Sequence, residues 1–112
     1  MQPKTKLNEK QHARHLAPRF ELGHVLATPG ALAACSLHGV APLHFIARHA
    51  HGDWGQVCEE DRQQNEAALA DGSRLLSSYE LPMQTGQMEA RKVWVITEAD
   101  RSATTLLLPS EY

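Results

Sequence analysis

Charged and hydroxyl side chains that could act together on a substrate gather near the end of the chain, at the turn of a predicted β-hairpin. We name this set the hairpin rim, and it comprises Glu98, Asp100, Arg101, Ser102 and Thr104. Cleavage of a phosphodiester bond in RNA needs a carboxylate to take the 2′-hydroxyl proton, an arginine to hold the phosphate and a histidine to protonate the leaving group. In such a site we expect Glu98, Arg101 and Arg74 to be catalytic, with a histidine nearby, and the other rim residues to bind substrate.

A second interpretation of the hairpin rim involves no chemistry. Asp and Ser are common in β-turns because their side chains bond to nearby backbone groups. Asp100-Arg101-Ser102 is then a hairpin turn with a surface ion pair, and such pairs contribute little to stability.

The hairpin that carries the rim belongs to the centre of a predicted sheet. Val93-Trp94-Val95-Ile96 is apolar on both alternating faces, which is typical of a central strand covered on both sides. Trp94 and Ile96 lie on one face of that strand. Its partner runs from Thr104 to Leu108, and a further strand runs from Arg74 to Leu81. The polar segment Pro82–Arg91 predicts a long connection between strands.

A helix is predicted directly after a short first strand over Phe20–Ala27. Gly23 weakens this strand and indicates either an edge strand or a bulge. Thr28 is a good N-cap and Pro29 suits the first helical position, so this helix runs through Leu37 and ends at Gly39. The side chains expected to face inward are Leu32, Cys35 and Ser36.

A second helix begins at Ala41-Pro42 and runs to about Ala50, ending at Gly52, and it forms a helical hairpin with the first. Its expected inward side chains are Leu43, Ile46 and Ala47. A third helix, from about Cys58 to Asp71, has acidic residues in its first turn and only a thin apolar stripe. It is therefore predicted to pack on the outside.

These elements predict an α+β fold in which two or three N-terminal helices pack on a C-terminal antiparallel sheet of three or four strands. The length of 112 residues corresponds to one domain, which we place at residues 20–112. Residues 1–19 are expected to form a flexible leader. No apolar run approaches a membrane span, so we expect a cytoplasmic protein with no membrane partner.

The predicted leader carries most of the excess positive charge. Residues 1–19 contain five basic residues and one acidic residue, a net charge of +4, which leaves −6 for the rest of a chain whose total is −2. A basic arm can contact nucleic acid, although short charged termini are usually solvated. The candidate binding residues in the leader are Lys4, Lys6, Lys10 and Arg14.

Seven histidines and two cysteines raise the question of a metal site. His44 and His49 would diverge by about 140° on a helix, whereas zinc ligands on helices sit three or four residues apart. Surface or capping histidines are therefore favoured, and we expect neither metal nor cofactor. Cys58 fits a helix-capping thiol, because the acidic residues after it oppose a reactive thiolate. Cys35 is expected in the core.

Trp54 lies in the predicted turn Asp53-Trp54-Gly55, where we expect it to plug one end of the core. We also include it among the candidate binding residues. The aromatic residues are dispersed, and no arrangement is typical of a sheet that stacks single-stranded nucleic acid. Glycine-rich phosphate loops and nucleophile elbows are absent.

Several motifs together resemble a family of small bacterial proteins found on plasmids and integrative elements. They are His24–Leu32, Leu43–His49 with Gly52–Gly55, Glu60–Arg62 with Asn65, Arg74–Ser77, Val93–Ser102, and Leu107–Pro109 with Glu111 and Tyr112. Members are sometimes labelled as plasmid-related proteins or as subunit M of a type I restriction enzyme. The chain has neither the glycine-rich loop nor the Pro-Pro-aromatic motif of a DNA methyltransferase, so the resemblance implies a genomic setting and no methyltransferase activity.

The order of elements is also similar to ribonucleases of the barnase, colicin and RelE type, which set helices before an antiparallel sheet. That similarity implies a small metal-independent ribonuclease using the hairpin rim. Our first hypothesis is a non-enzymatic accessory protein of mobile elements that binds a protein or nucleic-acid partner, and a homodimer is a further possibility. A ribonuclease is the second hypothesis, and an antagonist of host defence is the third.

Overall fold

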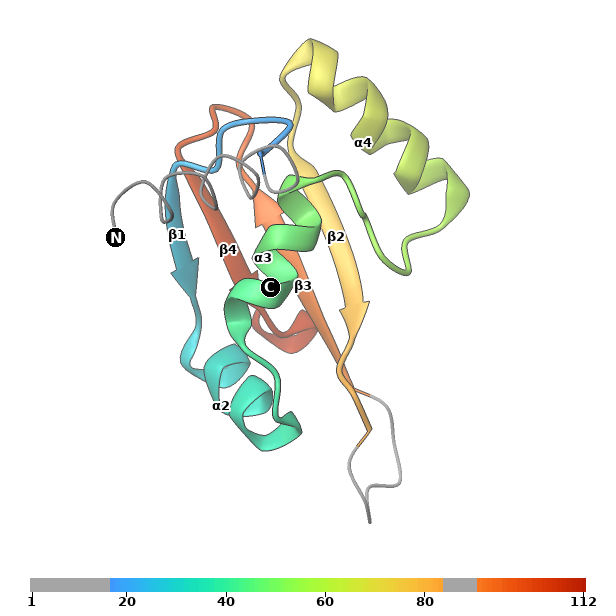
Figure 1. Cartoon of the computed structure of the whole chain (residues 1–112). Coiled ribbons are helices and arrows are strands. Elements are labelled where there is room, and N and C mark those ends of the chain that lie inside the picture. Colours follow the sequence, from blue (N-terminus) through green and yellow to red (C-terminus); the bar gives the residue numbers. More distant parts are fainter. Residues whose placement is uncertain (1–16, 84–90) are drawn as a thin grey trace, which may run out of the picture.

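The computed structural model describes residues 17–83 and 91–112 and has an α+β fold (Figure 1). One strand is followed by three helices, three more strands and a short 3-10 helix. Their bounds are β1 His24–Ala27, α2 Pro29–His38, α3 Pro42–Ala50, α4 Glu59–Asp71, β2 Leu75–Glu80, β3 Lys92–Thr97, β4 Ala103–Leu107 and η1 Pro109–Glu111. The predicted fold class is confirmed.

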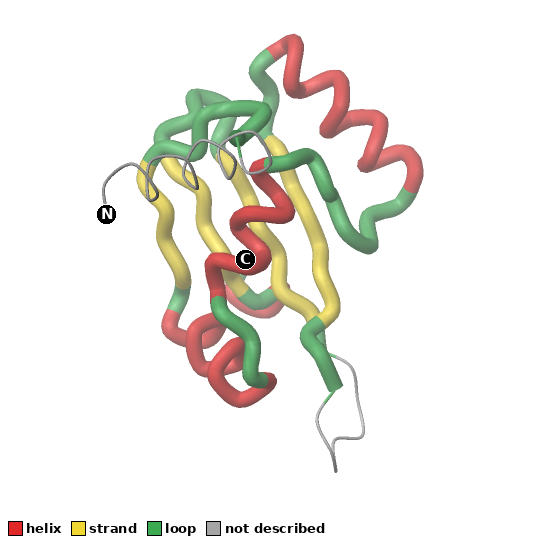
Figure 2. The backbone as a smooth tube through the Cα atoms, viewed as in Figure 1, coloured by secondary structure: helices red, strands yellow, loops and turns green. Residues whose placement is uncertain are grey.

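The four strands form one sheet in the order β1-β4-β3-β2 (Figure 2). β3 pairs antiparallel with both neighbours, so that Val95 lies opposite Ser77 on β2 and Leu106 on β4. Val95 is fully buried, and β3 is an inner strand of the sheet. The predicted central strand is thus confirmed.

β1 is the fourth strand, and it pairs parallel with β4. The edge position predicted for this segment is confirmed, but its parallel direction differs from the predicted antiparallel sheet. The pairing is fixed by backbone bonds to a distant part of the chain: His24 N donates to Ser102 O (2.9 Å) and Thr28 N donates to Leu106 O (3.0 Å). The local sequence pattern carries no signal for a partner so far away.

The helix α2 begins and ends as its sequence predicts. Thr28 Oγ1 accepts a hydrogen bond from Ala31 N (3.1 Å), and Gly39 adopts the left-handed conformation after the last turn (φ 71°). Its inward face differs from the prediction, because Leu32 is 47% exposed and Ser36 is exposed, while the buried residues are Ala31, Ala34, Cys35 and His38. Small side chains let α2 approach the sheet closely.

The helix α3 lies across one face of the sheet (Figure 1). Ile46 is buried as predicted, but Leu43 is 67% exposed, and the other buried residues are Phe45, His49 and Ala50. α2 and α3 meet at a bend of 106°, so they form an open corner instead of a tight helical hairpin. No single helix in the described ranges is long and apolar enough to span a membrane. The segments α2 and α3 meet that criterion only when they are counted together across their bend.

The helix α4 lies beside β2, outside the sheet (Figure 1), and only Asn65 and Ala68 on it are buried. The predicted outer position is confirmed. Trp54 is 3% exposed and packs with Ala68 and Leu75 in a small apolar cluster beneath α4. The expected plug is therefore present, and burial removes the Trp54 side chain from the surface where a binding role would need it.

Candidate functional site

The hairpin rim is held together by bonds within its own turn. Arg101 N donates to Glu98 O (2.9 Å), and Ser102 N donates to the Asp100 carboxylate (3.0 Å). Hydrogen bonds from Ser102 lower the pKa of Asp100. Glu98, Asp100 and Ser102 are exposed, and the hydrogen bonds within the rim are those of a β-turn.

Arg101 does not direct its guanidinium into open space. Nη1 donates to the carbonyl oxygens of Ser73 (2.7 Å), Glu98 (3.1 Å) and Ala99 (3.3 Å), and Nη2 donates to that of Ala68 (3.0 Å). A cation is favourable there because the carbonyl end of α4 is the negative end of its helix dipole. Arg101 therefore joins the β3–β4 turn to the end of α4.

Arg74 has a different partner. Its guanidinium lies 5.4 Å from the centre of the Tyr112 ring and hydrogen-bonds to the Tyr112 hydroxyl, while the same ring packs edge-on against Trp94 (5.7 Å). Arg74 and Arg101, which we expected to act in one catalytic site, therefore have separate sets of contacts.

Thr104 takes part in a buried chain of hydrogen bonds. Its Oγ1 donates to Leu22 O (2.7 Å) and lies 2.7 Å from Thr97 Oγ1. Thr97 Oγ1 in turn lies 2.8 Å from His49 Nε2. On the other side of the imidazole ring, His49 Nδ1 lies 2.6 Å from Ser77 Oγ. Each hydroxyl has one proton. Because Thr104 donates its proton to Leu22 O, the Thr97 hydroxyl must donate to Thr104. Thr97 then accepts a hydrogen bond from His49 Nε2–H, and the Ser77 hydroxyl donates to His49 Nδ1. This buried position corrects our expectation that Thr104 binds a ligand.

His49 is neutral in this network. Burial, with a smaller contribution from the charge of Arg101, lowers its pKa to about 3. The side chain has no exposed surface, so it does not meet a substrate's leaving group. The surface or capping role that we favoured for the histidines is wrong for His49. Its burial was indicated by its spacing on the helix, because it follows Ile46 by three residues and Phe45 by four and so shares their face.

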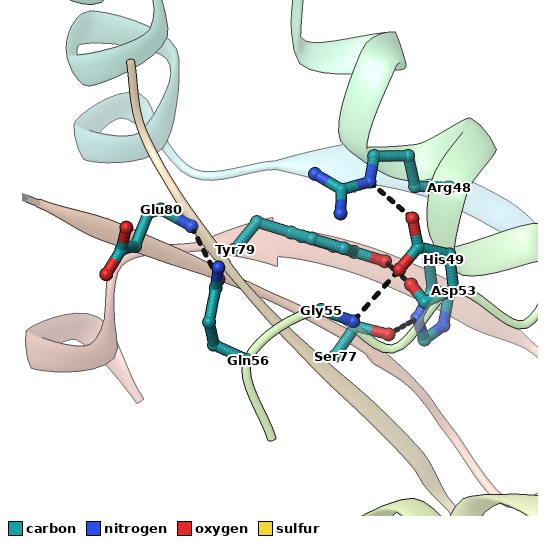
Figure 3. Close-up of polar contacts among 8 residues, drawn as sticks. All are labelled: Arg48, His49, Asp53, Gly55, Gln56, Ser77, Tyr79 and Glu80. Carbon is teal, nitrogen blue, oxygen red and sulfur yellow. Dashed lines mark hydrogen bonds and ion pairs between the residues drawn. The ribbon is translucent and has the colours of Figure 1, made fainter. Parts of the chain in front are cut away.

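A second polar cluster lies at the surface where α3 ends (Figure 3). Arg48 Nε donates to Asp53 Oδ2 (2.6 Å), and its guanidinium lies 4.5 Å from the centre of the Tyr79 ring. The Tyr79 hydroxyl donates to Asp53 O (2.5 Å), and Gly55 N donates to Asp53 Oδ1 (3.2 Å). The hydrogen bond from Arg48 is the main cause of the lowered pKa of Asp53. No local sequence pattern indicates this cluster, because it joins residues from a helix, a turn and a strand.

The outer edge of β2 is covered by side-chain and backbone groups. The amide of Asn65 on α4 pairs with Leu76 as a neighbouring strand would, donating to Leu76 O (2.7 Å) and accepting from Leu76 N (3.1 Å). Further along, Ser78 N donates to Trp54 O (3.1 Å), and Ser78 O accepts from Gln56 N (2.6 Å). The β2 edge therefore offers few free groups for pairing.

The segment from Trp54 to Gln56 also covers the end of β2. Gln56 Oε1 accepts from Glu80 N (3.1 Å), as Figure 3 shows. Gly55 lies so close to β2 that a Cβ on it would stand 1.9 Å from Ser78 O, and its φ of 75° also favours glycine. Gly55 thus permits the close backbone approach that closes this edge.

The outer edge of β1, at the other side of the sheet, is open. The nitrogens of His24 and Thr28 point to β4, so in an alternating strand the backbone groups of Val25 and Ala27 point away from it. No other strand in residues 17–83 and 91–112 pairs with this side. Val25 is 46% exposed and Leu26 is 51% exposed. We name this feature the β1 edge.

Lys4, Lys6, Lys10 and Arg14, together with most of the predicted leader, lie outside the described residues, as do residues 84–90 of the predicted connection. Cys58 caps α4 as expected, since its sulfur accepts from Asp61 N (3.4 Å). Cys35 is buried as expected, and burial raises its pKa. Among the described residues, no three His, Cys, Asp or Glu side chains are grouped so that they could hold a metal ion.

Comparisons of this chain with protein-family models, with curated proteins and with solved structures found no match. We therefore base its function on the geometry of its own residues.

Proposed function

We propose that the chain is a non-enzymatic binding module whose β1 edge adds an extended strand from a protein partner. The observation that carries this proposal is the contrast between the two edges of the sheet. Asn65 and Trp54–Gln56 cover the backbone of β2, whereas no strand within the described residues covers that of β1. Proteins usually protect open edges against pairing, so an unprotected one is a natural docking place.

The composition of β1 supports a partner strand of apolar character. His24-Val25-Leu26-Ala27 contains no charged residue of the kind that usually protects an edge, and no proline. Val25 shares a face with Thr104, and Leu26 shares the opposite face with Thr105. An added strand with apolar residues on both faces would cover both exposed side chains while its backbone bonds to Val25 and Ala27.

The ribonuclease hypothesis receives less support from the contacts of its proposed residues. Arg101 already donates to four carbonyl oxygens and Arg74 contacts Tyr112, so neither guanidinium is free to hold a phosphate without giving up these partners. The buried His49 does not serve as a proton donor to a substrate. The proposed setting remains the bacterial cytoplasm with plasmids or integrative elements, as the sequence resemblance implies, and a host-defence protein is one class of partner that fits.

A peptide array with one selective substitution tests the proposal. Extended peptides of about ten residues with apolar residues on both faces should bind with a Kd of about 1–100 μM. Val25→Pro removes an N–H that points away from β4, so it should weaken binding about tenfold or more while the fold is kept. Leu43→Ala, on an exposed apolar residue of α3, is the matched control and should bind normally.

Two results would count against this function. Equal binding by Val25→Pro and the unchanged protein would place the peptide elsewhere. A concentration-dependent dimer that Val25→Pro dissociates, seen by light scattering, would mean that a second copy occupies the edge, and it would overturn the choice of a different protein as partner.

A further inference from the structure

A surface groove beside α3 is independent of the β1 edge. Its volume is about 380 Å³, and it is lined by His44, Ala47, Arg48, His51 and Asp53. His44, Arg48 and His51 follow one another at intervals of four and three residues, so they lie on one face of the helix. Three nitrogen-bearing side chains therefore border a single concavity.

Arg48 is held in place before any ligand arrives. Asp53 fixes Nε at 2.6 Å, and the ring of Tyr79 supports the guanidinium plane at 4.5 Å. Neither terminal nitrogen of Arg48 has a hydrogen-bond partner in residues 17–83 and 91–112. These nitrogens can take two oxygens of one oxyanion, and little side-chain freedom is lost when they do so.

His51 provides a further unoccupied group at the same groove. Its Nε2 atom is buried and has no hydrogen-bond partner among the described residues. A buried polar atom without a partner is unfavourable, so a turn of the His51 ring that brings Nε2 to a ligand oxygen recovers that cost. His44, exposed one turn before Arg48, can add a third contact.

The charged groups around the groove leave the terminal nitrogens of Arg48 as its available donors. Asp53 is neutralised by Arg48, and Tyr79 donates its hydroxyl to Asp53 O. Beside His51, Arg19 lies against Gly52 and is paired with Glu66 (3.2 Å). Asp53 is the one carboxylate among the described residues that line the groove.

We propose that this groove binds the phosphate group of a small phosphate monoester. Arg48 takes two phosphate oxygens side by side and His51 takes the third, which matches the three terminal oxygens of a monoester. The groove is larger than one phosphate group, so the organic part of the ligand lies along Ala47 and His44.

NMR titration of the whole chain tests the site, with inorganic phosphate, ribose 5-phosphate and phosphoserine as separate probes at one fixed pH. We expect shifts at His44, Arg48 and His51. The probe that binds most tightly identifies the source of the phosphate: the free ion, a sugar phosphate or a phosphorylated amino acid. Chloride at matched ionic strength should leave these resonances unmoved.

Variants separate the site from general charge effects. Arg48→Gln should lower affinity about tenfold or more, and Arg48→Lys should recover only part of it because lysine lacks the paired nitrogens. His44→Gln alters an exposed residue and should weaken binding severalfold, so it decides the question even if Arg48→Gln unfolds. Arg62→Gln, which removes an exposed arginine paired with Glu59 on α4, should bind normally. Absence of shifts at about 10 mM phosphate, or equal shifts with chloride, would overturn the proposal.

Discussion

The hydroxyl oxygens of Thr97 and Thr104 lie 2.7 Å apart in the protein interior, directly opposite each other on β3 and β4. Through His49 and Ser77 the same chain of hydrogen bonds reaches α3 and β2, and through Leu22 O it reaches the segment before β1. The network thus joins four elements and the segment before β1. Buried polar groups of this kind are costly to leave unpaired, so each member should matter for stability.

Removal of one hydroxyl from this network tests its contribution. Thr104→Val keeps the shape of the side chain but leaves Thr97 without its acceptor and Leu22 O without its donor, so the free energy of unfolding should fall by about 1–3 kcal/mol. Thr105→Val, a half-buried neighbour on the opposite face, is the control for urea denaturation. Equal loss in both variants would show that the network has no special role.

The low pKa of His49, about 3, makes stability depend on pH. Unfolded histidine takes up a proton near pH 6.5, whereas folded His49 stays neutral, so the unfolded state binds more protons between these values. Stability should therefore fall with decreasing pH across this range, by at most about 1.4 kcal/mol per pH unit from this residue.

Two measurements separate His49 from the carboxylates that also titrate. The ring resonances of His49 should stay constant between about pH 8 and about pH 4.5, with free histidine as an internal reference. In His49→Gln, the loss of stability over the same interval should be smaller. A His49 ring that titrates near pH 6.5 would contradict a neutral buried imidazole.

Arg101 should stabilise the folded state, and its guanidinium should not be free to bind phosphate. Arg101→Ala removes the donors to four carbonyl oxygens and should cost about 1–3 kcal/mol in urea denaturation. Since Arg101 has a φ of 61°, Arg101→Gly should be about 1 kcal/mol more stable than Arg101→Ala. Wild-type stability in Arg101→Ala would mean that the guanidinium is free.

The Asn65 amide should be specific for the backbone of Leu76. In Asn65→Asp the carboxylate still accepts from Leu76 N but repels Leu76 O, so the variant should be about 1–3 kcal/mol less stable at neutral pH. Part of that loss should return at about pH 4, where a protonated Asp can donate. Denaturation at both pH values, compared with the unchanged protein, checks this; a loss that is the same at both would argue against the bond to Leu76 O.

The sequence was informative wherever a structural signal is local. Thr28, Pro29 and Gly39 mark the ends of α2 because capping depends on residues within one turn. The apolar faces of Val93 to Ile96 likewise indicate a strand covered on both sides. The inward face of α2 was predicted less well, because the size of Leu32 suggested burial while the close approach to the sheet selects Ala31 and Ala34.

Contacts between distant segments were beyond the local pattern. The pairing of β1 with β4, the path from Ser77 to Leu22 and the Arg48–Asp53–Tyr79 cluster each join separate elements. For the hairpin rim, the sequence correctly predicted a charged turn whose residues lie close together. No local pattern indicates that the Arg101 guanidinium donates hydrogen bonds to carbonyl oxygens of α4 and of the loop after it.

Amide hydrogen exchange at the two sheet edges tests the central claim most directly. In the free protein, Val25 and Ala27 should exchange fast, while Leu76, Ser78 and Glu80 on the covered edge exchange slowly. Saturation with an array-selected peptide should slow Val25 and Ala27 and leave the β2 edge unchanged. Slow exchange at Val25 and Ala27 in the free monomer, or no change in their exchange on peptide binding, would contradict a binding module that uses the β1 edge.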